Sequence, residues 1–144
     1  MKALSRFFQW LISSTLAVLG FSACDFQEPA MYGTPIASYS IKAKVLDSKQ
    51  KPIPEIKVRI TDNGFPIDSL YTNATGEVLF EFGDCMCNVI GVECEDVDGD
   101  KNGNFEDKIV IIQFENSDYK GGDGWYRGKA EKDITIEMEN KTEE

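Results

Sequence analysis

Apolar and polar residues alternate along much of the chain after Ile36, and this period of two limits the fold more than any other feature of the sequence. From Tyr39 to Val45 every second residue is apolar, and the residues between them are serine or lysine. Alternation of this kind gives an extended strand one apolar face and one polar face. No stretch has the helical period of an amphipathic helix. The sequence therefore predicts an all-β fold.

Short apolar stretches recur between clusters of turn-forming residues such as Ser48–Pro52 and Thr72–Gly76. Glycine, proline, asparagine and aspartate favour turns, so each cluster is expected to end a strand. The glycine-rich stretch Lys120–Gly124 is predicted to be a flexible loop. Seven short strands with frequent turns indicate a single two-sheet β-sandwich. They are predicted over residues 39–45, 53–60, 67–71, 78–82, 89–94, 108–114 and 133–138.

The first 23 residues have the organisation of an export signal. Lys2 and Arg6 give a positively charged start, and a mostly apolar stretch over residues 7–19 follows. This stretch is shorter than the roughly 20 residues that a membrane-spanning helix needs. Small residues precede Cys24, as they do at signal cleavage sites. The sequence therefore predicts a signal peptide over residues 1–23 rather than a transmembrane helix.

The end of this segment, Phe21-Ser22-Ala23-Cys24, resembles a bacterial lipobox, although Phe21 stands where leucine is usual. The resemblance implies that the Cys24 thiol receives a diacylglycerol, that palmitate and related acyl chains anchor the chain, and that cleavage makes Cys24 the new N-terminus. Residues 24–35 are then a lipidated tether, and residues 36–140 form the sandwich domain. The expected location is the cell envelope, on the periplasmic or surface face of a bacterial membrane, with the outer membrane favoured. The alternative is an ordinary secretory signal followed by a chance cysteine.

Charge and composition exclude several classes of function. The net charge is −10, and removal of residues 1–23 takes away two cations and no acid, which leaves −12. A surface this acidic repels phosphate backbones, so nucleic acid is not an expected partner. The chain contains no histidine, so the usual Ser-His-Asp triad cannot form. We therefore expect no enzyme activity, and we favour a binding or accessory module with an undefined ligand.

The segment from Ile41 to Phe82 resembles the transthyretin-like (prealbumin-like) sandwich of carboxypeptidase-regulatory-like domains. Three features carry the resemblance: Pro52-Ile53-Pro54 after a polar turn, the Thr-x-x-x-Gly turn at Thr72–Gly76, and the apolar strand that begins Val78-Leu79-Phe80. Gly76 would supply the positive φ that such a tight turn requires. The resemblance implies a fold and no particular chemistry.

A second resemblance extends over most of the chain after Cys24, to a family of radical-SAM-associated lipoproteins of Bacteroidota. It rests on Tyr32-Gly33-Thr34-Pro35, on Asp96–Gly99 with Asn102-Gly103, and on Trp125-Tyr126-x-Gly128. It implies a gene beside that of a radical-SAM protein. The alternative function is therefore that of a substrate or partner of a radical-SAM maturation enzyme. The oligomeric state is left open.

The acidic loop over residues 93–107 contains the opening half of an EF-hand calcium loop. Alternate oxygen-bearing side chains followed by a glycine at the bend can converge on one hard cation. The twelfth position holds Ile109 where an EF-hand has a bidentate glutamate, so a complete EF-hand is excluded. The alternatives are a helix-free Ca²⁺ site, completed by flanking carboxylates such as Glu106, and an empty acidic turn. The candidate ligands are Asp96, Asp98, Asp100, Asn102, Asn104 and Asp107.

Once Cys24 is lipidated, Cys85, Cys87 and Cys94 remain as disulfide candidates. On an extended strand, Cys85 and Cys87 would point to the same face, which is a poor geometry for a bond between them. A bond from Cys94 to either of them is feasible across neighbouring strands in an oxidising compartment and would leave one thiol over, and the alternatives of paired, free or modified thiols stay open. The radical-SAM resemblance adds the hypothesis that one of these sulfur atoms is enzymatically modified.

Overall fold

The computed structural model describes residues 33–142. The folded domain lies within the unit Thr34–Glu144. The predicted signal peptide, the lipidation at Cys24 and most of the tether lie outside the described residues. Within residues 33–142, no helix is long and apolar enough to cross a membrane.

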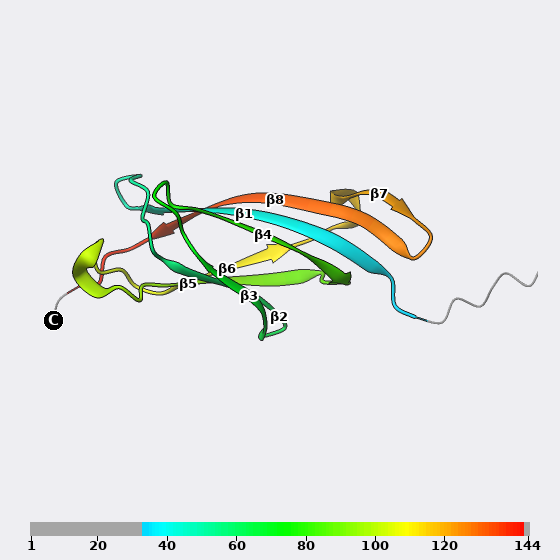
Figure 1. Cartoon of the computed structure of the whole chain (residues 1–144), viewed down its shortest axis with the longest axis horizontal. Helices are drawn as coiled ribbons and strands as arrows, with labels where there is room; N and C mark the ends of the chain where they lie inside the picture. Colours follow the sequence, from blue (N-terminus) through cyan, green and yellow to red (C-terminus); the bar gives the residue numbers. More distant parts are fainter. Residues whose placement is uncertain (1–32, 143–144) are drawn as a thin grey trace, which may run out of the picture. The chain divides into compact units, whose positions relative to one another are not determined.

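Eight strands and two short 3₁₀-helices make up the described domain, and the strands form two four-stranded sheets (Figure 1). One sheet has the strand order β4-β1-β8-β7, and the other has the order β3-β2-β5-β6. All neighbouring strands are antiparallel except β1 and β8, which are parallel. The elements are β1 (Ile36–Asp47), β2 (Lys57–Asp62), β3 (Phe65–Tyr71), β4 (Glu77–Cys85), β5 (Val89–Glu95), η1 (Gly99–Lys101), β6 (Lys108–Gln113), η2 (Asn116–Asp118), β7 (Tyr119–Asp123) and β8 (Tyr126–Met138).

The core lies between the two sheets and is built from alternate residues of their strands. In β1 every second residue from Ala37 to Val45 is at most 1% exposed, as the alternation predicted. The second sheet contributes the inner faces of β2 and β5, with Ile60 and Ile90 fully buried. Removal of this apolar surface from water is the main stabilising term of the sandwich. The predicted all-β, two-sheet sandwich is confirmed.

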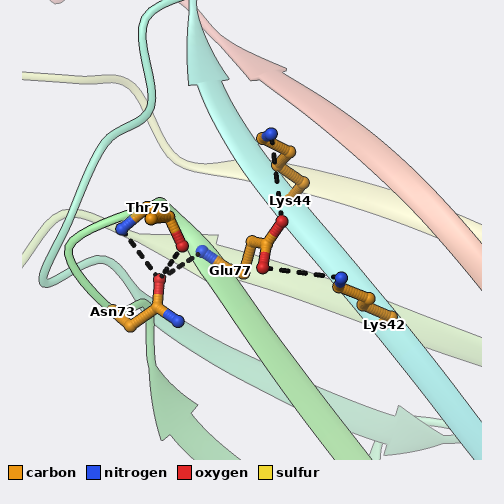
Figure 2. Close-up of polar contacts among 5 residues, drawn as sticks. All are labelled: Lys42, Lys44, Asn73, Thr75 and Glu77. Atoms are coloured by element: carbon orange, nitrogen blue, oxygen red, sulfur yellow. Dashed lines mark hydrogen bonds and ion pairs between the residues drawn. The ribbon is translucent and has the colours of Figure 1, made fainter.

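The segment from Ile41 to Phe82 folds as its transthyretin-like resemblance implies, with β1, a proline-containing connection, β2, β3 and β4 in succession. Gly76 has φ +71, and a Cβ at this position would lie 2.6 Å from the Val45 carbonyl oxygen. In the same turn, the Asn73 Oδ1 atom accepts hydrogen bonds from the Thr75 amide, the Thr75 hydroxyl and the Glu77 amide, at 2.7–3.0 Å (Figure 2). These bonds close the connection between β3 and β4.

Ion pairs at the surface accompany the pairing of β4, the strand that follows this turn, with β1. Glu77 at the start of β4 lies opposite Lys44 of β1. Its carboxylate oxygens lie 3.5 Å from Lys42 Nζ and 3.9 Å from Lys44 Nζ (Figure 2). Exposed pairs of this kind contribute at most about 1 kcal/mol each, so they assist the pairing of β1 with β4 and do not determine it.

The structure corrects the predicted strands at the C-terminal end of the chain. It has eight strands instead of seven, because residues 119–123 form β7, of which Lys120–Asp123 was predicted as a loop. The last strand, β8, begins at Tyr126 instead of Asp133. The inward-facing residues in the first half of β8 are Gly128 and Ala130, and residues this small do not produce a visible apolar alternation. Strand β7 has no alternation and is extended because it pairs with β8.

Candidate functional site

A pocket of about 390 Å³ lies beside the β2–β3 hairpin and the last residues of β4. Its volume is within the range of roughly 300–1,000 Å³ that is usual for small-molecule sites. The lining is mostly apolar, and Asp62 supplies its carboxylate. The lining residues are Asp62, Asn63, Phe65, Pro66, Ile67, Phe82, Gly83, Cys85 and Cys87.

Two aromatic residues, Phe65 and Phe82, line this pocket. Phe65, at the start of β3, is 77% exposed, although it is one of the largest apolar side chains of the domain. Phe82 is half-buried, and its ring stacks on that of Tyr39 with a centroid distance of 4.9 Å and an interplanar angle of 12°. The Phe82 side of the pocket is therefore anchored in the core. Phe65 is free of such packing and is available to contact a ligand.

The pocket contains two thiols that the structure places together. The Sγ atoms of Cys85 and Cys87 lie 2.8 Å apart, so the expectation of a poor geometry between them is wrong. The reason is that β4 ends at Cys85, so Met86 and Cys87 lie outside the extended conformation that was assumed for the pair. A β-bulge, in which one residue of β1 between Ala37 and Tyr39 faces two residues of β4, precedes the two cysteines.

Cys94 lies apart from this pair. It is the sixth residue of β5, is 1% exposed, and faces Val58 and Lys108 in the neighbouring strands. The five steps from Val89 to Cys94 along an extended strand cover roughly 16 Å. Burial raises the pKa of the Cys94 thiol to about 12. Cys94 is therefore a buried, protonated thiol in the second sheet.

Two tyrosines of the first sheet form hydrogen bonds with the backbone of Cys87. The Tyr39 hydroxyl oxygen accepts a hydrogen bond from the Cys87 amide at 2.7 Å and lies 3.2 Å from the Tyr119 hydroxyl oxygen. The Tyr119 hydroxyl donates to the Cys87 carbonyl oxygen at 3.5 Å. Burial raises the pKa of Tyr39, and the hydrogen bond to Tyr119 raises it further. Both polar groups of the Cys87 backbone are thus satisfied by side chains of the first sheet, which fixes the thiol segment.

The acidic loop is folded around hydrogen bonds between its own side chains. Asp98 Oδ2 accepts a hydrogen bond from Asn102 Nδ2, and Asp100 Oδ1 accepts one from Asn104 Nδ2 at 3.3 Å. Asp96 Oδ2 accepts the Phe105 amide at 2.8 Å. These contacts bring the candidate ligands together in pairs. Asp107 is exposed, and the described part of the chain contains no group of three or more acidic, cysteine or histidine side chains gathered as a metal site would require.

Two oxygen atoms in this loop have no protein partner. Asp96 Oδ1 and Asp98 Oδ1 are both buried and make no hydrogen bond. A buried carboxylate oxygen without a partner is costly, and a cation or a water molecule would satisfy it. Asp96 and Asp98 are both among the ligands predicted from the sequence. The hydrogen bonds from Asn102 to Asp98 and from Asn104 to Asp100 were not predicted.

No family model and no curated protein matches this chain. Among solved structures, it is similar to the 5-hydroxyisourate hydrolase of Klebsiella pneumoniae, with 14% identity and a TM-score of 0.48 over 72% of this chain and 92% of the hydrolase. It is also similar to the TIE protein of Bacillus anthracis, with 13% identity and a TM-score of 0.42 over 70% of this chain and 16% of that protein. Neither similarity implies an activity for this chain.

Proposed function

We propose that this protein is a non-enzymatic binding module that a lipid on Cys24 tethers to a bacterial envelope membrane. We further propose that the pocket beside Phe65 takes a small apolar or aromatic ligand. The observation that carries the binding role is the exposed Phe65 ring at the edge of a mostly apolar pocket of about 390 Å³. The lipobox resemblance at Phe21–Cys24 supports the tether.

The chemistry of the pocket favours an uncharged ligand with a flat apolar part. Phe65 and Phe82 offer ring faces, and Pro66 and Ile67 add aliphatic surface. Asp62 is the one carboxylate among the lining residues, and it would orient a ligand that carries a hydrogen-bond donor. The net charge of −12 after residue 23 disfavours acidic ligands.

Replacement of Phe65 by alanine is expected to weaken binding of a neutral apolar probe to this pocket. Nile red is a suitable probe, titrated by fluorescence against the full chain. Loss of one aromatic contact removes about 1.4 kcal/mol of binding free energy, which corresponds to roughly a tenfold rise in Kd. The matched control is Ile109→Ala, because Ile109 on β6 is 65% exposed and does not line this pocket. Equal affinities of the Phe65→Ala and unmodified proteins would refute the assignment of the pocket.

The alternative proposal is that the protein is a substrate or partner of a radical-SAM maturation enzyme. Its support is the resemblance around Asp96–Gly103 and Trp125–Gly128, together with the half-buried Cys85 at the pocket surface. A covalent modification would appear as mass on residues 33–142 beyond the encoded value, in protein isolated from cells that hold both genes. A mass equal to the encoded value would eliminate the substrate role.

We also propose that the acidic loop binds Ca²⁺ weakly, because a cation would satisfy the buried oxygens of Asp96 and Asp98. A Kd of about 10⁻³ M, as in extracellular modules, gives a stabilisation of about 1.4 kcal/mol at about 10 mM Ca²⁺. We expect Tm to rise by a few degrees with Ca²⁺, and Asp98→Asn to abolish this rise. Asp123→Asn, on the exposed strand β7, is the control for the loss of one charge. An unchanged Tm would identify the loop as an empty acidic turn.

A further inference from the structure

We infer that Cys85 and Cys87 are a redox pair that closes into a Cys85–Cys87 disulfide by exchange with a small-molecule disulfide, while Cys94 stays a reduced thiol. This inference goes beyond the proposed binding role, because it assigns a covalent site. It concerns the β4 end of the pocket and does not depend on which ligand the pocket takes.

The two thiols are close enough to bond after a small movement. The Cys85 and Cys87 Sγ atoms are 2.8 Å apart. A disulfide bond is about 2.05 Å long, so the two atoms need to approach by about 1 Å or less. Strand β4 ends at Cys85, and Met86 and Cys87 lie beyond it, so the two thiols are not held at the spacing of an extended strand. Met86 between them packs against the core, and the Tyr39 hydroxyl holds the Cys87 amide, so the segment is already fixed in the form that brings the thiols together.

Cys94 lies far along β5, away from the end that follows the thiol pair. The five steps from Val89, the first residue of β5 after Cys87, to Cys94 cover roughly 16 Å, whereas bonded cysteines have Cα atoms about 4.4–6.8 Å apart. Its side chain is buried between the sheets with 1% exposure. A bond from Cys94 to either partner would require β5 to leave the second sheet. The expectation that Cys94 takes part in the disulfide therefore has no support in this fold.

The two thiols differ in exposure, and this difference sets the order of the reaction. Cys85 is half-buried and lines the open pocket, whereas Cys87 is 2% exposed. Burial raises the pKa of the Cys87 thiol well above its usual range, and the nearby Cys85 and Asp62 raise it further. Since the thiolate is the attacking species, Cys85 is the first nucleophile and Cys87 the resolving thiol.

The thiol–disulfide exchange has two steps. The Cys85 thiolate attacks one sulfur of the small disulfide, forms a mixed disulfide and releases the first small thiol. Cys87 loses its proton, and its thiolate attacks the Cys85 sulfur, which forms the intramolecular bond and releases the second small thiol. The protein dithiol loses two electrons and two protons, and the small disulfide gains them as two thiols. An oxidising envelope supplies disulfides of this class.

Met86 makes the pairing directly measurable in the full chain. The reduced protein is treated with glutathione disulfide, and its remaining thiols are then alkylated. Cyanogen bromide cleaves the chain after Met86, and a glutamate-specific protease cleaves it after Glu81, Glu93 and Glu95. The three cysteines then lie on separate fragments, 82–86, 87–93 and 94–95. We expect fragments 82–86 and 87–93 to be joined and fragment 94–95 to be alkylated. A bond to fragment 94–95, or three alkylated fragments at every glutathione disulfide concentration, overturns the inference.

Variants test the roles of the individual residues. Cys87→Ser is expected to stop the reaction at the mixed disulfide, which is seen as glutathione mass on fragment 82–86. Cys94→Ala is expected to leave the pairing unchanged.

Discussion

Replacement of Gly128 by alanine is expected to lower the free energy of unfolding by about 3 kcal/mol or more, which places it among the most damaging single changes in the domain. Gly128 has φ +107, a conformation that residues with a side chain rarely adopt. An added Cβ would lie 2.3 Å from the Lys120 carbonyl oxygen and 2.9 Å from the Gly122 nitrogen. These are backbone atoms of β7, so they cannot rotate away. Relief of the clash requires the β7–β8 pairing to open.

The control for this prediction is Gly121→Ala in the same hairpin. Gly121 lies opposite Gly128 and has φ +71, but a Cβ at this position would meet no atom within 4 Å. Its substitution therefore measures the backbone conformation alone, which is worth about 1–2 kcal/mol. Urea unfolding followed by far-UV circular dichroism gives both values, with m expected to be unchanged. Equal costs at the two positions would show that β7 does not approach Gly128 this closely.

Replacement of Cys24 by alanine is expected to remove acylation completely. In cells fed an alkyne-labelled palmitate, the unmodified chain should take up the label and sediment with membranes, whereas the Cys24→Ala chain should carry no label. The reason is that the lipobox resemblance assigns the acceptor thiol to Cys24, and two or more acyl chains are needed for stable anchoring. The label is measured as fluorescence of the protein band, and the intact mass of the protein gives the mass of the acyl chains.

Cys94→Ala is the matched control for this experiment, because Cys94 is a buried thiol and is not an expected acceptor. It should be labelled as strongly as the unmodified chain. Label on the Cys24→Ala chain would place the acyl group on another residue. A mature chain that begins elsewhere and carries no acyl mass would instead identify an ordinary secretory signal, and the proposed membrane tether would be wrong.

Several strands could be predicted from the sequence because their signal is local. The alternation from Tyr39 to Val45 encodes a buried and an exposed face, and β1 has this pattern of burial. The Thr72–Gly76 turn was predictable for a similar reason: Gly76 adopts the positive φ that its residue type favours. In both cases the energetic preference lies within a few neighbouring residues.

The C-terminal hairpin could not be predicted in this way. Strand β7 consists of Tyr-Lys-Gly-Gly-Asp, which has no strand preference of its own and is extended only because β8 supplies its hydrogen bonds. The first half of β8 has glycine and alanine on its inner face, and at Gly128 the backbone of β7 lies too close for a larger side chain. Without their partner strands, these residues have the sequence pattern of a loop.

The candidate site divides in the same way. The sequence by itself determined that the chain forms a β-sandwich, that it carries three cysteines after Cys24, and that its acidic loop concentrates carboxylates. Only the tertiary structure decided that Cys85 meets Cys87 and that Phe65 stands at the edge of a pocket. The reason is physical: strand periodicity depends on neighbours in the sequence, whereas the end of β4 at Cys85 and the pocket depend on how far β4 pairs with β1 and how it packs beside the β2–β3 hairpin.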